Sequence, residues 1–379
     1  MTEFAIATSW DDNELLVRLH KLNQQYKQKD RRVTEIFGSL KTGITGSGRP
    51  AYRLPDVSWK QMIKHVRDAH KYGIRFNYTM NAPDFGGREA DKSWVKEVVE
   101  FIARLDEEAG VDCLTITHPF LIGLVKEKFP RLGVYLSLIA GVDTVEQAKK
   151  HEDMGVDVIH LSPFTINRDF KMIKQIVGAL DIPVVLYANI PCLSHCPWRD
   201  AHYKFFGYAS QSGDKHITTR FDPYIAKCSL EYLNDPIRLP ASPFIRPEDI
   251  REYEQIGVKH FKLSDRSEST DFLVYTAEAY LNIEYHGDLF KLIFRSGSKF
   301  KTGIKSLYPE VADFDIPIAI YNDALTGMDF IGNIKRLHGQ ELLDFYGEVV
   351  DRCMVIEQTE QLNKLKGYLK IISRKRRNL

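Results

Sequence analysis

The chain has 379 residues, of which 44% are apolar and 27% charged, and its formal net charge is +1. This composition is typical of a soluble globular protein with a full core, and the length suits one large α/β domain with an appendage. The near-zero charge provides no overall field toward nucleic acid or a membrane surface, and no apolar stretch is long enough to span a bilayer.

Short β-rich runs alternate with amphipathic helical stretches through residue 285. The eight runs that we interpret as strands cover residues 4–8, 33–40, 74–80, 113–117, 134–140, 158–162, 184–188 and 260–264. Helices are predicted between them, for example over 60–72, 94–108 and 144–154, each with a glycine one or two residues beyond its end. This alternation predicts a (β/α)8 TIM-type barrel. A doubly wound open sheet is the alternative, but no Gly-x-Gly-x-x-Gly turn follows the first strand.

Two connections in the predicted barrel are unusually long. Residues 41–58 follow the second strand and contain Arg49 and Arg53 among several glycines. Residues 189–246 form an insertion between the seventh strand and a helix that begins at Pro247. Structureless connections of this length are uncommon unless they bind or catalyse, so we expect function in the insertion.

The pattern changes after residue 285. A strand-like run at 316–321 precedes two charged amphipathic helices, near 340–357 and 359–372. We therefore expect a barrel over 1–285, including the insertion, and a small α+β appendage over 286–379 that packs on it. The appendage has no recognisable chemical motif, and Cys353 is interpreted as a half-buried packing residue.

Active sites of such barrels form at the carboxyl ends of the strands. The residues predicted there are Ser9, Ser39, Asn81, Thr117, His118, Ser162, Asn189, Asp265 and Arg266. This ring is polar but mostly neutral, which suits a small polar or anionic substrate. It lacks the carboxylate pair of a glycosidase, a Ser-His-Asp order and a His-Glu-x-x-His helix. Each residue, taken alone, is better explained as an ordinary polar cap on a strand end.

Three of the five cysteines, Cys192, Cys196 and Cys228, lie in the 189–246 insertion. Soft thiolate ligands select zinc or an iron–sulfur cluster. Zinc needs a fourth ligand, which His195 or His202 could supply, whereas a [4Fe–4S] cluster usually takes four cysteines. Neither Cys113, at the other end of a strand, nor the distant Cys353 is a suitable fourth. Three unliganded thiols remain the alternative.

Arg199 and His202 lie one helical turn apart, directly after Cys196. If a helix begins there, both side chains point the same way. An arginine can clamp a carboxylate and a histidine can move a proton, so Arg199 and His202 are candidate catalytic residues, together with Asn189. The alternative is that they orient the thiolate loop.

The odd number of cysteines does not predict a disulfide framework. The amino-terminal stretch also has the wrong length and flanks for a signal peptide. A reducing cytoplasm is therefore the expected location, and there free thiolates remain available to a metal.

Three segments resemble peptidase family U32, the collagenase-like protease family: residues 189–202 (Asn-Ile-Pro-Cys-Leu-Ser-His-Cys-Pro-Trp-Arg-Asp-Ala-His), 244–250 and 261–266. The resemblance implies a barrel with a [4Fe–4S] cluster held by Cys192, Cys196 and Cys228, with Asn189, Arg199 and His202 around it. Relatives include oxygen-independent hydroxylases of ubiquinone precursors, which act as paired related subunits. Others hydroxylate bases in RNA, with prephenate implicated as the oxygen source. This chain departs from the family in having no evident fourth cysteine in the insertion.

These observations predict an iron–sulfur enzyme that modifies a small polar or anionic molecule, for example by hydroxylation. A U32-type peptidase and a metal-stabilised, non-catalytic partner subunit are the alternatives. The expected partners are the small-molecule substrate and either a related subunit or a second copy of the chain. Because no strongly basic surface is evident, nucleic acid is not an expected partner.

Overall fold

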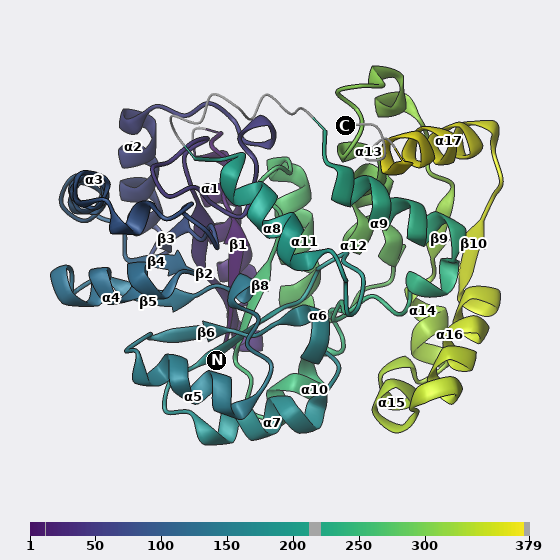
Figure 1. Cartoon of the computed structure of the whole chain (residues 1–379). Helices are drawn as coiled ribbons and strands as arrows, with labels where there is room; N and C mark the ends of the chain where they lie inside the picture. Colours follow the sequence, from purple (N-terminus) through teal and green to yellow (C-terminus); the bar gives the residue numbers. More distant parts are fainter. Residues whose placement is uncertain (12, 212–220, 375–379) are drawn as a thin grey trace. The chain divides into compact units, whose positions relative to one another are not determined.

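A computed structural model describes residues 1–11, 13–211 and 221–374 (Figure 1). The chain divides into two compact units, each assembled from separate segments. The first unit comprises Met1–Ala188, the described part of Arg199–Ile217, and Ile245–Ile283. The second comprises Asn189–Trp198 and the described parts of Thr218–Phe244 and Glu284–Leu379. The cysteine-bearing segments, assigned to the barrel from the sequence, thus belong by their contacts to the second unit.

The first unit is a closed barrel of eight parallel strands. The strands are β1 Thr2–Ala7, β2 Arg31–Gly38, β3 Arg75–Met80, β4 Cys113–Ile116, β5 Gly133–Leu136, β6 Val158–His160, β7 Val184–Tyr187 and β8 His260–Leu263. Each strand pairs with the next along the chain, and β8 closes the barrel against β1, with Glu3 opposite His260. This closed arrangement confirms the predicted TIM-type barrel. The alternation of eight β-rich runs with helices is the pattern from which it was predicted.

Helices surround the barrel (Figure 1). They are α1 Glu14–Gln25, α2 Trp59–Lys71, α3 Lys92–Arg104, α4 Pro119–Lys128, α5 Val145–Asp153, α6 Pro163–Ile166, α7 Phe170–Ala179, α8 Arg199–Tyr208, α10 Ile250–Gln255 and α11 Thr270–Asn282. At the start of α2, Ser58 and Gln61 form a reciprocal capping box. Met62 and Val66, one helical turn apart, are part of the buried face of this helix. Local capping and apolar spacing therefore account for where such a helix begins and which side it buries.

The second unit combines helices with a two-stranded antiparallel sheet. Its elements are α9 Pro223–Asn234, α12 Leu289–Phe294, α13 Ser298–Thr302, β9 Ile318–Ile320, α14 Asn322–Gly327, α15 Phe330–Arg336, α16 Gly339–Cys353, β10 Met354–Ile356 and α17 Glu360–Arg374. Helices α9 and α17 pack against each other. No helix among the described residues is long and apolar enough to cross a membrane.

Three sequence expectations are corrected here. The helix predicted over 340–357 ends at Cys353, because Met354–Ile356 pairs with β9 instead of continuing the helix. Cys353 is fully buried, not half-buried, with its sulfur 3.2 Å from that of Met328. The insertion 189–246 is not structureless, since it contains α8 and α9, and Cys228 lies on α9 instead of on a loop.

Candidate functional site

Arg266 follows β8 and lies buried at the carboxyl end of the barrel. Its Nη1 donates hydrogen bonds to Ser39 Oγ at 2.5 Å and Thr79 Oγ1 at 2.7 Å, and its Nη2 donates to Ser47 Oγ at 3.3 Å. Burial, and after it the nearby Arg49 guanidinium, lower the pKa of Arg266 to about 9. The guanidinium is thus desolvated but held by three hydroxyl groups, one on β3 and two in the loop after β2.

Asp265 lies between two further arginines. Its carboxylate accepts a hydrogen bond from Arg49 Nε at 2.8 Å and forms an ion pair with Arg53 at 3.1 Å. Burial alone would lower the pKa of Arg49, but the Asp265 carboxylate raises it, so Arg49 stays charged. Together with Arg266, these four groups sum to a charge of +2. The barrel mouth therefore favours an anion, and arginine forks suit carboxylates or phosphates.

Arg49 and Arg53 lie in the long loop after the second predicted strand and were not predicted as members of the ring of site residues. The sequence feature that could have identified them as site residues is the glycine-rich loop in which they lie. Gly46 has φ +73°, and a Cβ there would lie 2.6 Å from the carbonyl oxygen of Gly207 in α8. Only glycine permits this approach, and it turns the loop back over the strand ends.

Helix α8 begins at Arg199, as the spacing of Arg199 and His202 requires. Arg199 Nη1 lies 3.5 Å from Ser162 Oγ, at the end of β6, and the guanidinium lies 5.8 Å from the Phe164 ring centroid. The His202 ring packs on Phe206, with centroids 4.1 Å apart. Arg199 therefore reaches the predicted strand-end ring. The catalytic roles of Arg199 and His202 stay predictions.

Lys262 on β8 is a buried cation inside the barrel, and sequence reasoning missed it. It is 1% exposed, and its Nζ lies 3.8 Å from the Phe37 ring centroid and 5.7 Å from that of Tyr187. Its ammonium has no hydrogen bond or ion pair with the described residues. Burial lowers the pKa of Lys262 to about 8, although Glu35 acts in the opposite direction. Burial also raises the pKa of Glu35, whose Oε1 accepts a hydrogen bond from Asn77.

The three candidate metal ligands lie together in the second unit. Cys192 and Cys196 are half-buried in Asn189–Trp198, and Cys228 is buried in α9. Burial raises the pKa of Cys228 to about 12; the Lys299 ammonium opposes the rise, and the thiols of Cys192 and Cys196 add to it. The three thiols are thus close enough to influence one another electrostatically. Asn189, another candidate, is buried at the start of the same segment.

The other two cysteines do not join this group. Cys113 lies inside the barrel, with its sulfur 3.8 Å from Glu35 Oε2, and Cys353 packs against Met328. Within residues 1–11, 13–211 and 221–374, no three His, Cys, Asp or Glu side chains are placed to hold one metal ion. A tetrahedral zinc ion with bonds of about 2.3 Å needs thiolate sulfurs roughly 4 Å apart. The cysteines of a [4Fe–4S] cluster bind different irons, so a cluster does not require the three thiols to meet at one ion.

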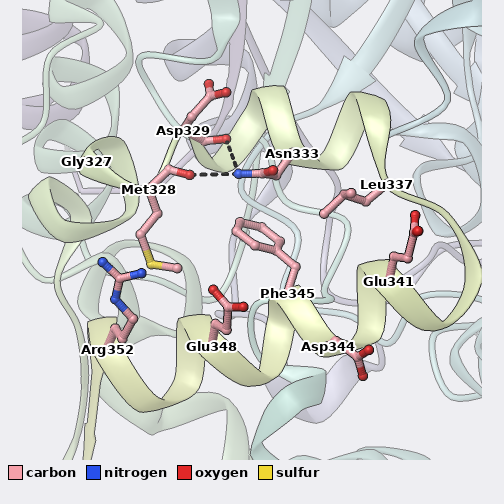
Figure 2. A pocket seen from close by; sticks show the side chains of 10 residues that line it. All are labelled: Gly327, Met328, Asp329, Asn333, Leu337, Glu341, Asp344, Phe345, Glu348 and Arg352. Carbon is pink, nitrogen blue, oxygen red and sulfur yellow. Dashed lines mark hydrogen bonds between the residues drawn. The ribbon is translucent and has the colours of Figure 1, made fainter.

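A separate groove in the second unit lies between α15 and α16 (Figure 2). It has a volume of about 570 Å³, and Asn333 Nδ2 donates a hydrogen bond across its end to the Met328 carbonyl at 2.8 Å. The charged residues that line it are Asp329, Glu341, Asp344, Glu348 and Arg352. With four carboxylates and one guanidinium, the groove repels anions. It is therefore not a suitable site for the predicted anionic substrate.

Comparison with known proteins places the chain in a family. The model of peptidase family U32 matches residues 47–189. An uncharacterized protease of Methanocaldococcus jannaschii is 30% identical over 276 residues, which cover 73% of this chain and 79% of that protein. The chain belongs to peptidase family U32. The family resemblance inferred from the three sequence segments is thereby confirmed.

Two further proteins are similar to this U32 protein. The tRNA hydroxylation protein P of Escherichia coli is 22% identical over 153 residues, or 39% of this chain and 32% of that protein. Among solved structures, a U32 peptidase is 18% identical, with a TM-score of 0.49, and the match covers 70% of this chain and 93% of that one.

Proposed function

We propose that this U32 protein is an iron–sulfur enzyme that modifies a small anionic substrate, for example by hydroxylation. One observation supports the cofactor most strongly: the only three cysteines of the insertion gather beside a buried ammonium, although two lie on a loop and one on a helix. Isolated packing cysteines need neither one another nor a cation. The described similarity to a tRNA hydroxylation protein is consistent with the reaction class.

In this proposal Cys192, Cys196 and Cys228 hold a [4Fe–4S] cluster. When bound, such a cluster takes up and releases single electrons at a potential set by its surroundings. The thiols provide the soft ligands, and the buried faces of α9 limit contact with water. Three cysteine ligands leave one iron to be completed by a group other than a cysteine of the insertion.

The substrate is proposed to bind at the barrel mouth. Arg49 and Arg53 flank Asp265 there, and Arg266 adds a third, desolvated guanidinium. A carboxylate in this place would meet preformed hydrogen-bond donors in a low-dielectric setting. Arg199, at the end of β6, is proposed as a further clamp, and His202 as the group that moves a proton, with Asn189 as an additional polar contact.

The iron content of anaerobically purified protein tests the cofactor. We expect about four irons and four acid-labile sulfides per chain, with a brown colour. Cys192→Ser should lose most of both, because a thiolate ligand is removed. Cys353→Ala is the matched control, since Cys353 is also a cysteine of the second unit but packs against Met328. Its iron content should equal that of the wild type.

Other outcomes would contradict this proposal. Stoichiometric zinc without sulfide would favour the metal-stabilised partner subunit. Hydrolysis of a defined peptide by metal-free protein would favour a peptidase. Undiminished iron in Cys192→Ser would show that the cluster, if present, lies elsewhere.

The substrate site is tested by titration with prephenate, a dicarboxylate that the family resemblance implicates. Arg49→Gln should weaken its binding by about ten-fold or more, because a charge-assisted hydrogen bond contributes ~1.5–3 kcal/mol. Arg18→Gln is the control: Arg18 also pairs with an aspartate, Asp271, but on helices α1 and α11 outside the barrel. Equal affinities for Arg49→Gln and wild type, measured by calorimetry, would remove the barrel mouth as the binding site for this probe.

A further inference from the structure

Lys299 in α13 is an unusually buried lysine. It is 7% exposed, and lysines are almost never buried unless they are paired, because removing an ammonium from water is costly. No carboxylate of the described residues lies within ion-pair distance of its Nζ. Its surroundings include a thiol that can carry negative charge, since Lys299 lowers the pKa of Cys228. Asp222 also influences Cys228, but its carboxylate caps α9 through the backbone amides of Tyr224 and Ile225.

The contacts of Lys299 join the two cysteine-bearing segments. Its Nζ donates a hydrogen bond to the carbonyl oxygen of Pro191, the residue directly before Cys192. It also lies 4.4 Å from the ring centroid of Tyr232, one helical turn after Cys228 on α9. The Tyr232 hydroxyl is fixed in turn by a 2.7 Å hydrogen bond to Ser242 Oγ. One side chain thus touches the backbone beside one thiol and the helix face that carries another.

Helix α13 is itself held in place at both ends. Gly297 precedes it with φ +81°, and a Cβ there would lie 2.5 Å from Ile316, so only glycine fits. Phe300 is fully buried next to Lys299. After the helix, the carbonyl of Gly303 accepts a hydrogen bond from the amide of Asp222, at the start of α9. The position of Lys299 is therefore determined by the surrounding structure and not by its own flexible chain.

We propose that Lys299 is a positioning residue of the cysteine site, which holds the Cys192 segment through the Pro191 carbonyl and provides the buried positive charge that offsets the thiolates. Its role toward a cluster rests on the proposed iron–sulfur function. Three thiolates give a [4Fe–4S] centre a net negative charge, which increases on reduction. A fixed ammonium nearby stabilises the reduced state and so raises the midpoint potential.

The variants Lys299→Met and Lys299→Arg separate charge from bulk. In anaerobic protein, Lys299→Met should lower the cluster's midpoint potential, measured by a redox titration followed by electron paramagnetic resonance, and at least halve the iron content. Lys299→Arg keeps the charge and should stay close to wild type in both. Lys301→Met is the matched control, because Lys301 lies on the same helix and also donates to backbone carbonyls, those of Ala312 and Phe314.

Amide hydrogen exchange in metal-free protein provides a reading that is independent of iron. A peptide covering residues 189–198 should exchange several-fold faster in Lys299→Met than in wild type or Lys301→Met, because the bond to the Pro191 carbonyl is lost. Iron-free wild type would refute the proposed function, and the exchange rates would then decide the positioning role alone. Unchanged exchange in Lys299→Met, or an unchanged potential in iron-containing Lys299→Met, would overturn the inference. If Lys299→Met does not fold, an unaltered potential and unaltered exchange in Lys299→Gln would overturn it equally.

Discussion

At the scale of single residues, the polar interior of the barrel affects stability, because it contains a buried lysine. Lys262 carries an ammonium group among aromatic rings, and the Glu35 carboxylate is the group that most raises its pKa against the effect of burial. Such a group destabilises the folded state unless a ligand compensates it. Proteins retain destabilising charges of this kind mainly at functional sites.

The pKa of Lys262 leads to a prediction about pH. Because its pKa falls from 10.5 to about 8 on folding, the unfolded state binds more protons between these values. Stability contributed by this group therefore rises as the pH increases from about 8 to 10.5, and below pH 8 burial of the charge costs up to ~3 kcal/mol. Lys262→Met should raise the free energy of unfolding at pH 7, by an amount that shrinks toward pH 10.5. Urea unfolding of both proteins at several pH values measures the difference; a constant difference would contradict it.

Individual residues also show what sequence reasoning can reach. Arg266 and Ser39 were placed at the barrel mouth because they follow predicted strands, and the structure brings them into contact. Lys262 lies within a predicted strand, but nothing local shows that its amine is buried. Lys299 had no signal at all, since its partners are distant in sequence and only the tertiary structure brings them together.

At the scale of elements, α9 links helix formation to the cysteine site. Asp222 is fully buried at its N-cap and accepts hydrogen bonds from the amides of Tyr224 and Ile225, both at 2.9 Å. Six residues later the helix presents Cys228. The cap therefore fixes both the start of the helix and the position of a proposed ligand.

Asp222→Ala should lower the free energy of unfolding by ~1–2 kcal/mol, because the first-turn amides lose their acceptor, and should also reduce the iron content. Asp169→Ala is the matched control: Asp169 caps α7 in the barrel through the amide of Met172. Asp169→Ala should lower the free energy of unfolding by the same amount as Asp222→Ala or by less, and its iron content should equal that of the wild type. Urea unfolding measures the stability of each variant, and iron analysis measures its metal content. A full iron content in Asp222→Ala would show that the cap of α9 is not needed for the cysteine site.

Elements were predictable where a local pattern dictated them. All eight barrel strands were located from short β-rich runs, and the helix considered for Arg199 and His202 is present as α8. The predicted carboxyl end of the helix over 340–357 was wrong, because Met354–Ile356 pairs with β9, a strand more than thirty residues away in the sequence. The helices of the insertion were missed because the absence of strands was interpreted as an absence of structure.

At the scale of the whole molecule, the barrel and the second unit are interleaved in sequence. The chain leaves the barrel at Asn189, returns at Arg199 and leaves it again before α9. Composition and periodicity cannot reveal such an exchange, because each segment has an ordinary local pattern. The family, by contrast, could be identified from three short segments, and the match to a U32 relative over 276 residues confirms it.

The hydrogen bond from Lys299 to the Pro191 carbonyl joins residues 108 positions apart, which has a consequence for the order of synthesis. A ribosome makes Cys192, Cys196 and Cys228 well before it makes Lys299. The growing chain therefore displays all three thiols before their ammonium partner and the helix that carries it exist. Under the proposed iron–sulfur function, metal delivered at that stage would meet ligands without a fixed geometry, and loading would then wait until the carboxyl-terminal third of the chain has emerged and folded.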